Sequence, residues 1–454
     1  MQKDLHIIIL AAGAGTRMKS RVPKVLQTLG GRPMIIHVLD TATQLKPAAI
    51  HVVFNPSAPE LREACAGFDI TWTPQPEQLG TGHAVVQVMP AIPEEGQVLV
   101  LYGDTPLVDP VVLQALVDIP CAGLKVLTMD VPEPAGYGRI LRDSQDNITA
   151  IIEERDASAS QRAITEVNSG IILAQRSALM ACLDSLASDN DQNEYYLTDI
   201  FSIAHNKGLP TASLLAPDPV DLEGANDRIQ LAALERRFQM KKATELMRAG
   251  VQLSDPARID IRGSVEAGSD VTIDVNVILA GDVSLGDGVQ IGPGCVLTNC
   301  QLAAGTRVHA YSVLEGMSTL GACDIGPFAR VRPGTELEAG SRVGNFVEVK
   351  NTRLGKDSKA SHLSYLGDSS IGDRVNIGAG TITCNYDGVN KHRTVIGDDV
   401  FIGSDTQLIA PVTVGEGADI GAGTTLTKDA PEGRLTLSRA KQVTVPGWKR
   451  PVKD

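Results

Sequence analysis

The stretch "VIGDDVFIGSDTQLIAPVTVGEGADIGAGTTL", residues 395–426, places an aliphatic side chain at every sixth position. The repeated residues are Ile396, Ile402, Leu408, Val414, Ile420 and Leu426. A small or β-branched residue follows several of these four positions later, at Val400, Thr406, Val412, Ala418 and Thr424. A sustained period of six is typical of a parallel β-helix, in which each hexad supplies one short strand and stacked aliphatic side chains fill the interior.

The period of six begins well before this stretch. It starts near residue 265, slips by one position near residue 300 and resumes at residue 325. The upstream positions are Val265, Val271, Val277, Val283, Val289, Cys295, Ile325, Val331, Leu337, Val343, Val349, Ile371 and Ile377. A series of this length is not a chance pattern, and it predicts a β-helix. Parallel crossovers are normally right-handed, and the period alone does not indicate the other hand.

The first half of the chain has a different pattern, in which short apolar strands alternate with helical stretches. This alternation predicts an α/β domain with a Rossmann-like mixed sheet that is mainly parallel. We expect strands at 5–10, 51–54, 97–102, 123–131 and 170–174.

The segment 227–249 connects the two patterns. It places Leu231, Leu234 and Phe238 on one helical face and ends at Gly250, which predicts an amphipathic helix. We therefore expect an N-terminal domain over 1–226, a helical linker over 227–250, and the β-helix with a C-terminal tail over 251–454.

Composition and charge limit the function. The 454 residues include 54 acidic and 41 basic side chains, giving a formal net charge of −13 that repels nucleic acid and acidic membranes. No uncharged apolar run approaches the roughly 18 residues that a membrane span needs. The seven cysteines are odd in number and form no CxxC pair, which argues for a reducing compartment and against a zinc site. We expect a cytoplasmic protein without nucleic-acid or membrane partners.

The N-terminal loop indicates an anion site. The stretch "LHIIILAAGAGTRMKSRVPK", residues 5–24, lacks the third glycine of GxGxxG and the P-loop spacing. Backbone N–H groups near Gly13 and Gly15, with Arg17 and Lys24, still suit a phosphorylated ligand. A tight turn with two solvated cations is the alternative interpretation.

A second loop follows the apolar strand in "VLVLYGDTPL", residues 98–107. Ligands of open α/β sheets bind outside the carboxyl ends of strands, which is where Asp104 lies. Its carboxylate is suited to Mg²⁺, an ion that prefers one or two protein oxygens plus substrate phosphates. Alternatively, Asp104 caps the turn before Pro106.

Polar segments interrupt the period of six. The stretch "CNYDGVNKHR", residues 384–393, breaks the series, and "KASHLSYLGD", residues 359–368, introduces His362 and Tyr365. Arg332 and Lys350 add cations from nearby hexads. Each has a structural alternative: His362 as a hydrogen-bonded histidine, and Arg332 and Lys350 as solvated charges.

Several motifs together resemble known families. The loop "LAAGAGTRM…PK" is similar to the signature of the sugar-nucleotide pyrophosphorylases. The whole chain resembles the bacterial bifunctional N-acetylglucosamine-1-phosphate uridyltransferases/glucosamine-1-phosphate N-acetyltransferases. The further motifs that carry this resemblance are "QPEQLGTGHA" (75–84), "LYGD" (101–104), "GYGRI" (136–140), "IIEERDA" (151–157), "EVNSGI" (166–171), "EGANDR" (223–228) and the hexads.

The resemblance implies a uridylyltransferase site in the first half. Arg17 and Lys24 are expected to act in catalysis at the phosphates, and Asp104 and Asn226 are expected to hold Mg²⁺. The residues expected to bind UTP or UDP-N-acetylglucosamine are Leu10, Ala11, Ala12, Gly13, Lys24, Gln75, Gly80, Thr81, Tyr102, Gly103, Asp104, Gly138, Glu153, Asn168 and Asn226. From the residues alone, Asn226 is equally an ordinary N-cap beside Asp227.

The resemblance also implies an acetyltransferase site in a left-handed β-helix. His362 matches the general base that deprotonates the amine of glucosamine-1-phosphate, and Asn385 would orient the imidazole or polarise the thioester carbonyl. The residues expected to hold glucosamine-1-phosphate are Arg332, Lys350, Tyr365 and Asn376. Those expected to contact acetyl-CoA are Ala379, Asn385, Tyr386, Lys391, Ser404, Ala422 and Arg439.

The function implied is the synthesis of UDP-N-acetylglucosamine for peptidoglycan and lipopolysaccharide. The second half acetylates glucosamine-1-phosphate with acetyl-CoA, and the first half transfers uridylate from UTP to N-acetylglucosamine-1-phosphate. The family also implies a homotrimer with acetyl-transfer sites between neighbours. Two alternatives remain: a nucleotidyltransferase whose β-helix is only a scaffold, and a nucleotide-sugar binding protein without turnover, which Asp104 beside the phosphate loop disfavours.

Overall fold

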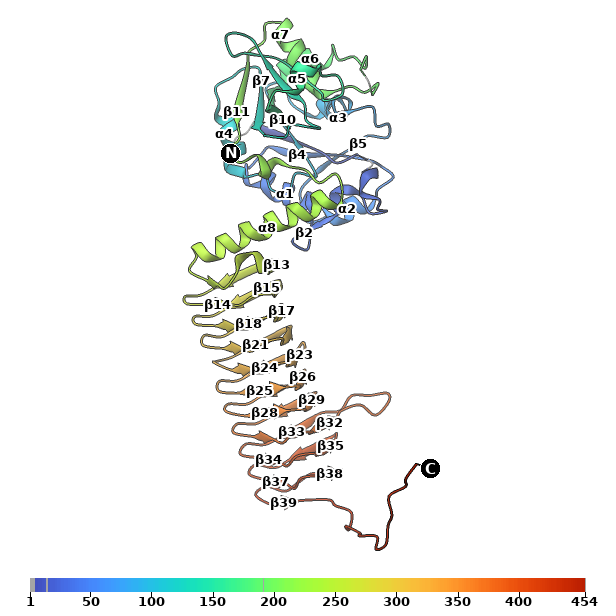
Figure 1. The fold of residues 1–454 in the computed structure, drawn as a ribbon, viewed down its shortest axis with the longest axis vertical. Coiled ribbons are helices and arrows are strands. Elements are labelled where there is room, and N and C mark those ends of the chain that lie inside the picture. The colour runs from blue at the N-terminus through green and yellow to red at the C-terminus, as the bar shows by residue number, and fades with distance from the viewer. Residues whose placement is uncertain (1–4, 14, 191, 454) are drawn as a thin grey trace. The chain divides into compact units, whose positions relative to one another are not determined.

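The computed structural model describes residues 5–13, 15–190 and 192–453 (Figure 1). They form two compact units that divide between Phe238 and Gln239. The boundary falls inside helix α8 (Arg228–Arg248), so the helix belongs to both units. None of the helices in the described part of the chain is both long and apolar enough to cross a membrane.

The first unit is built on a nine-stranded mixed sheet. Its main order is β11-β7-β10-β6-β1-β4-β5, and β10 runs antiparallel to β6 and β7 while the other pairs along this path are parallel. Strands β8 and β9 form a hairpin that extends from β10. The strands are β1 (Leu5–Leu10), β4 (Ala49–Phe54), β5 (Thr71–Pro74), β6 (Gln97–Tyr102), β7 (Leu124–Asp130), β8 (Arg139–Arg142), β9 (Ile148–Ile152), β10 (Glu166–Gln175) and β11 (Thr211–Leu215).

Helices cover both faces of this sheet. In β1, Ile7 and Ile9 join one apolar cluster while Ile8 joins the other, because successive side chains of a strand point to opposite faces. The first cluster includes residues of α1 (Met34–Gln44), α2 (Glu60–Ala64) and α4 (Pro110–Asp118). The second includes residues of α3 (Thr81–Val88), α6 (Arg176–Leu183) and α7 (Ile200–Asn206). The mixed α/β sheet expected from the sequence is confirmed.

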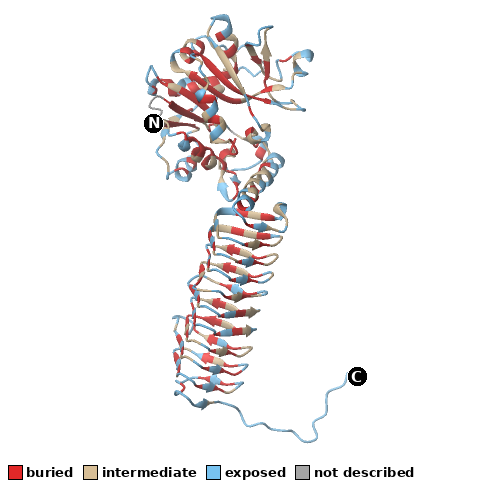
Figure 2. Ribbon diagram, turned by 90° about the vertical axis from the view of Figure 1, so that its left-hand side faces the viewer, coloured by how far each residue is buried: buried red, intermediate tan, exposed pale blue. Residues whose placement is uncertain are grey.

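The second unit is a parallel β-helix of hexapeptide repeats with the architecture of the left-handed class. Its strands run from β12 (Gln252–Leu253) to β39 (Leu435–Thr436), and every pairing between its named strands is parallel. Figure 2 shows the buried residues recurring coil after coil. Ile377, for example, lies in register with Ala360 on one side and Ile402 on the other.

The slip near residue 300 follows from the length of one coil. Ile278 pairs with Val296, eighteen residues away, whereas Ser284 of the same strand pairs with Gln301, only seventeen away. One corner of the coil is therefore a residue shorter, and the aliphatic series shifts by one position. The predicted core positions are buried, except Val265, which is partly buried and packs against the core from the first coil.

Helix α8 uses different faces in the two units. Leu234 is buried in the first unit, with Leu231 and Phe238 packed against the same small cluster. Farther along the helix, Ala243 and Leu246 join the core of the β-helix unit. The expected amphipathic helix is present, and it ends two residues before Gly250.

Two candidate active sites

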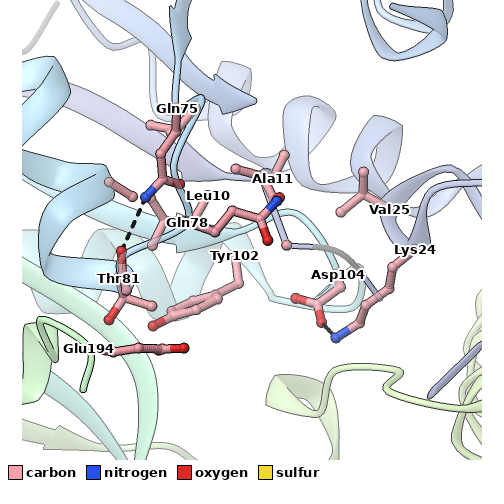
Figure 3. A pocket seen from close by; sticks show the side chains of 15 residues that line it. Leu10, Ala11, Lys24, Val25, Gln75, Gln78, Thr81, Tyr102, Asp104 and Glu194 are labelled. Atoms are coloured by element: carbon pink, nitrogen blue, oxygen red, sulfur yellow. Dashed lines mark hydrogen bonds and ion pairs between the residues drawn. The ribbon is translucent and has the colours of Figure 1, made fainter. Parts of the chain in front are cut away.

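The first candidate site is a cavity of about 340 Å³ at the carboxyl ends of β1 and β6 (Figure 3). These strands are parallel neighbours, and Gly103 N–H donates to the Leu10 carbonyl at 3.0 Å, which brings their two following loops together. The cavity is lined by Leu10, Ala11, Ala12, Gly13, Lys24, Val25, Val53, Gln75, Gln78, Gly80, Thr81, Ala84, Tyr102, Asp104 and Glu194. Most of the predicted nucleotide-binding residues therefore meet at one cavity.

The turn before α3 is fixed by backbone geometry. Gly80 has a φ of 111°, and a side chain there would lie 2.6 Å from the Tyr195 carbonyl oxygen, so the position requires glycine. The buried Gln75 side chain donates from Nε2 to the Gly80 carbonyl at 3.3 Å. These contacts place an amide and the start of a helix at one wall of the cavity.

Gln78, another residue of this wall, was not predicted from the sequence. Its Nε2 donates to the Ala12 carbonyl at 2.7 Å, which ties the 75–84 segment to the N-terminal loop. Gln78 lies inside a quoted motif, between Gln75 and Gly80, and this proximity was the available signal. Glu194 was also missed, and no local pattern marked it.

Gly138, Glu153 and Asn168 meet beside this cavity through the β8–β9 hairpin. Asn168 N–H donates to the Gly138 carbonyl at 2.8 Å, and a side chain at Gly138 would lie 3.5 Å from Glu153 Oε1. Thr198 Oγ1 donates to the same carboxylate oxygen at 2.9 Å. Burial raises the pKa of Glu153. It also raises the pKa of Tyr102, with smaller contributions from Glu153 and Asp104.

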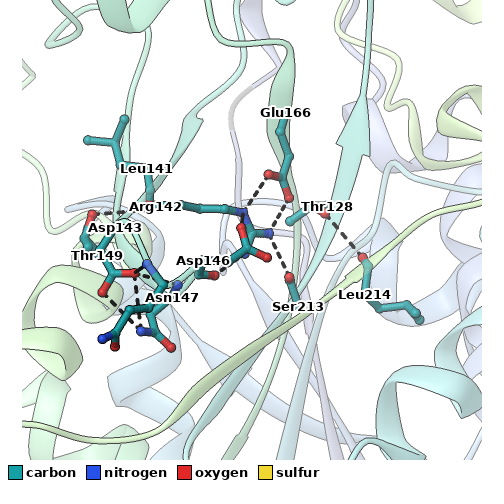
Figure 4. A network of polar contacts seen from close by, with 11 residues as sticks. Thr128, Leu141, Arg142, Asp143, Asp146, Asn147, Thr149, Glu166, Ser213 and Leu214 are labelled. Atoms are coloured by element: carbon teal, nitrogen blue, oxygen red, sulfur yellow. Dashed lines mark hydrogen bonds and ion pairs between the residues drawn. The ribbon is translucent and has the colours of Figure 1, made fainter.

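A polar network anchors this hairpin (Figure 4). Arg142 of β8 donates from Nε and Nη2 to the Glu166 carboxylate at 2.8 and 2.6 Å, and from Nη2 to Ser213 Oγ at 2.9 Å. The hydrogen bonds that Arg142 donates to Glu166 raise the pKa of Arg142. Glu166 starts β10 and Ser213 lies in β11, so one guanidinium connects three strands.

Lys24, Asp104 and Asn226 form a compact polar group. The Lys24 ammonium forms an ion pair with Asp104 and donates to Asn226 Oδ1 at 2.8 Å, while Arg17 Nη2 donates to the same oxygen at 3.0 Å. Asp227, not Asn226, caps α8, because its Oδ1 accepts from the N–H groups of Ile229 and Gln230. The N-cap alternative for Asn226 is therefore wrong. One carboxylate and one amide oxygen, held beside the cations of Arg17 and Lys24, fit a divalent ion that binds mainly through the phosphates of its substrate.

The second candidate site lies on the outside of the β-helix. His362 ends β28 (Lys359–His362) and is exposed, in register with Asn345 at the end of β25 (Arg342–Asn345). His362 Nδ1 is 2.8 Å from Asn345 Oδ1. Asn345 was not among the predicted residues, although it lies one coil before the histidine.

Asn385 forms its side-chain hydrogen bonds with Asp368 and Tyr365. Its Nδ2 donates to Asp368 Oδ2 at 2.5 Å and lies 3.5 Å from the Tyr365 hydroxyl. Asn351 Nδ2 donates to the other oxygen of Asp368 at 2.7 Å. Burial acts to raise the pKa of Asp368, but these amide hydrogen bonds, together with the positive charges of Lys350 and Lys391, outweigh it and lower the pKa. Asp368, which closes the quoted stretch 359–368, was not identified from the sequence.

Cations gather around this amide network. Contact with the Lys350 side chain, and its positive charge, lower the pKa of Lys391. Tyr386 and Lys391 pair across the hairpin that interrupts the hexads. Arg332 Nη1 donates to Glu348 Oε1 at 2.9 Å. A concentration of positive charge at one exposed surface suits an anionic substrate.

Four of the seven predicted acetyl-CoA residues follow one corner of the β-helix. Asp405 N–H donates to the Ala379 carbonyl at 2.7 Å, and Gly423 N–H donates to the Ser404 carbonyl at 2.8 Å. Arg439 Nε donates to the Ala422 carbonyl at 3.0 Å. Ala379, Ser404, Ala422 and Arg439 are thus stacked in sequence order. Asn376 lies on β31 (Asn376–Ile377), in register with Lys359 and Phe401 of neighbouring coils.

Comparison with known proteins agrees with both units. Residues 7–155 match the MobA-like NTP transferase domain, and residues 268–299 and 393–428 match the bacterial transferase hexapeptide (six repeats). Three similar proteins, each named Bifunctional protein GlmU, come from Alkalilimnicola ehrlichii (54% identity, 99% of this chain and 97% of the relative), Stenotrophomonas maltophilia (54%, 100% of both) and Xylella fastidiosa (53%, 99% and 98%).

These relatives span both units, and each unit carries the fold that its activity requires. The chain belongs to the GlmU family of bifunctional enzymes, and it catalyses acetyl transfer to glucosamine-1-phosphate and uridylyl transfer to N-acetylglucosamine-1-phosphate in the synthesis of UDP-N-acetylglucosamine.

Proposed function

We propose that the two reactions use the two side-chain groups described above. The observation that carries this proposal is their separation: the Lys24–Asp104–Asn226 group lies at a cavity of the first unit, and the His362–Asn345 pair lies on the β-helix. Acetyl transfer comes first, because its product is the acceptor for the uridylyl group.

In the first unit, Leu10, Ala11, Ala12, Gly13, Tyr102 and Gly103 hold the nucleotide. The amide of Gln75, with Gly80 and Thr81, pairs with the imide edge of uracil, and the size of the cavity suits a nucleoside. Gly138, Glu153 and Asn168 bind the N-acetylglucosamine group. A sugar-phosphate oxygen attacks the α-phosphorus of UTP in line, and pyrophosphate leaves without a covalent enzyme intermediate.

Arg17 and Lys24 stabilise the charge that develops on the phosphates during this attack. Asp104 and Asn226 supply oxygens for a divalent ion, which we assign as Mg²⁺ because a single carboxylate with phosphate ligands is its usual coordination. When bound, this ion neutralises phosphate charge. The residues themselves align the phosphate chain and the attacking oxygen.

In the second unit, His362 Nε2 takes the proton from the amine of glucosamine-1-phosphate as the nitrogen attacks the thioester carbonyl of acetyl-CoA. Arg332 and Lys350 hold the sugar phosphate, and Tyr365 and Asn376 contact the sugar. The hydrogen bond to Asp368 fixes the orientation of the Asn385 side chain. Its amide N–H polarises the thioester carbonyl. Tyr386, Lys391 and the stacked corner residues Ala379, Ser404, Ala422 and Arg439 contact acetyl-CoA.

We further propose a cytoplasmic homotrimer. The second site is open and its histidine is exposed, so a neighbouring copy is needed to enclose the substrates. The hexapeptide-repeat match supports a trimer, the assembly implied by the resemblance.

The test uses purified full-length protein with glucosamine-1-phosphate, acetyl-CoA, UTP and Mg²⁺, followed by mass spectrometry. UDP-N-acetylglucosamine is the expected product. His362→Ala should lower acetyl transfer by about 10²- to 10⁴-fold. It should leave uridylyl transfer from supplied N-acetylglucosamine-1-phosphate unchanged. Equal loss of both activities would contradict separate sites. Undiminished acetyl transfer would remove His362 as the base.

A further inference from the structure

We propose that the Lys24 ammonium is the resident cation of the divalent-metal site. The free enzyme then binds a divalent ion weakly, and the ion enters together with the nucleotide, which draws Lys24 away. This inference rests on the proposed assignment of Asp104 and Asn226 as metal ligands. It concerns what occupies those oxygens before substrate arrives.

The contacts of Lys24 place its charge between the two ligands. Its Nζ forms an ion pair with Asp104 Oδ2 and donates to Asn226 Oδ1 at 2.8 Å. Arg17 Nη2 donates to the same amide oxygen at 3.0 Å. An amide oxygen has two lone pairs, and both are directed at cationic donors here. An incoming metal ion therefore has to displace at least one of them.

Burial strengthens this competition. The Lys24 and Asp104 side chains are only 16% and 15% exposed, so solvent screens their attraction less than it screens a surface pair. A second cation placed beside Asp104 would also be repelled by the ammonium. Lys24 thus weakens metal binding in two ways, by occupying the oxygens and by its charge.

The backbone holds Lys24 in this position. Lys24 follows Pro23 and begins a short 3₁₀ turn, Lys24–Leu26. Gly15 has a φ of 59°, and a Cβ there would lie 2.7 Å from the Lys24 Cβ, so the glycine loop packs directly against the lysine. Lys24 also lines the nucleotide cavity, so a bound nucleotide lies within reach of its side chain.

Binding of a nucleotide allows the metal ion to replace the Lys24 ammonium at these oxygens. Its phosphates offer Lys24 and Arg17 new anionic partners, which releases oxygens of Asp104 and Asn226 for the metal. Since coupling between two ligands is reciprocal, nucleotide strengthens metal binding and metal strengthens nucleotide binding by the same factor. Lys24 carries part of that coupling.

The experiment titrates Mn²⁺ into full-length protein without nucleotide, with free Mn²⁺ followed by electron paramagnetic resonance. Lys24→Gln should bind Mn²⁺ at least about tenfold more tightly than the parent protein. Lys24→Arg, which keeps the charge, should bind as weakly as the parent. Arg21→Gln removes one positive charge from an exposed position of the same loop and should leave the affinity unchanged.

Unchanged or weaker Mn²⁺ binding by Lys24→Gln, in protein with a native circular dichroism spectrum, would overturn the inference. An equal gain in Arg21→Gln would also overturn it, because general charge would then explain the effect. The metal assignment is tested separately by measuring how the Asp104→Asn variant binds Mn²⁺ in the presence of UTP. If that variant binds Mn²⁺ normally, the proposed metal site itself is wrong.

A separate observation concerns the histidine of the second unit. We infer that Asn345 is a positioning residue for His362, an inference that rests on the proposed role of His362 as base. An amide oxygen only accepts hydrogen bonds, so the 2.8 Å contact places the imidazole proton on Nδ1 and leaves the lone pair on Nε2. Asn345 and His362 are paired across adjacent strands, which fixes their orientation.

The partner is neutral, which distinguishes this pair from a histidine held by a carboxylate. The charged residues on the two paired strands are Arg342 and Lys359, in register with each other three residues earlier. These two strands therefore place no carboxylate beside the imidazole.

The test compares Asn345→Ala and Asn345→Asp in acetyl transfer. Asn345→Ala should lower kcat by about 10- to 100-fold with little change in either KM, and uridylyl transfer should be unaffected. Asn345→Asp should restore much of kcat and move the acidic limb of the kcat profile to higher pH, because a carboxylate favours the imidazolium. A kcat within twofold of the parent for Asn345→Ala, or identical pH profiles for Asn345→Asp and the parent, would overturn the inference.

Discussion

The two sites solve the same problem, binding a sugar phosphate, with opposite architecture. In the first unit, loops at the ends of parallel strands surround a cavity of about 340 Å³. In the second unit, side chains project outward from a rod whose interior is filled by aliphatic residues. An α/β sheet creates a site where its strands end, whereas a β-helix has no such edge along its length and creates a site by interrupting its repeat.

The strongest test of this comparison is Asp104→Ala. It removes the carboxylate that forms an ion pair with the Lys24 ammonium at the cavity. Uridylyl transfer should fall by about 10³-fold, because charge stabilisation contributes most of such a reaction. Acetyl transfer, assayed alone by release of free CoA, should stay within twofold of the parent. A parallel loss of acetyl transfer would show that the two sites are not independent.

A core substitution tests the rod itself. Ile377 is buried between Ala360 and Ile402 of the neighbouring coils, so Ile377→Ala should destabilise the β-helix by about 2 to 5 kcal/mol. Calorimetry of the full chain should show a lower transition for the second unit and an unchanged one for the first. Val395→Ala, at a 40% exposed position of β33 (Thr394–Ile396), is the matched control and should change little.

Acid should destabilise the first unit through His51. Burial, with the charge of His6 as a smaller cause, lowers the pKa of His51 to about 4. The unfolded chain therefore takes up the proton first, and the free energy of unfolding falls as pH drops below about 6.5, levelling off below about 4. Between pH 7 and 5 the loss is about 2 kcal/mol. Urea unfolding of His51→Phe should show a shallower pH dependence, and an unchanged one would contradict this cause.

The smallest expected effect concerns the hairpin that carries Gly138 and Glu153. Arg142→Ala removes the link from β8 to β10 and β11, so the sugar-binding residues become less well positioned. The KM for N-acetylglucosamine-1-phosphate should rise about three- to tenfold, the equivalent of roughly 1 kcal/mol. Arg62→Ala, at an arginine stacked over the Phe54 ring, is the control and should leave this KM unchanged.

Much of the fold could be predicted because the second half follows a single period of six and the first half alternates short apolar strands with helical stretches. The hexads identified the interior of the rod residue by residue, and even the slip near residue 300 corresponds to a coil of seventeen residues. The short strands β5, β8, β9 and β11 were missed, since strands of four or five residues with mixed burial give little alternation.

The site residues that could be predicted are those in loops that follow recognisable strands. Lys24 and Asp104 follow strands that the sequence reveals, so their meeting could be expected. Asn226 could not be distinguished from a cap without knowing that Asp227 makes the capping hydrogen bonds. Asn345 needed the coil length, because only the register shows that a residue seventeen positions earlier lies beside His362.

The stacked corner of Ala379, Ser404, Ala422 and Arg439 fixes distances along the β-helix. Adjacent coils are separated by the spacing of hydrogen-bonded strands, about 4.8 Å. Three coils from His362 to Ala422 therefore span roughly 14 Å, by the same spacing. If these residues bind acetyl-CoA as proposed, the number of coils sets the distance between the base and the far end of the CoA site, and deleting one coil between these positions would shorten that distance by one strand spacing.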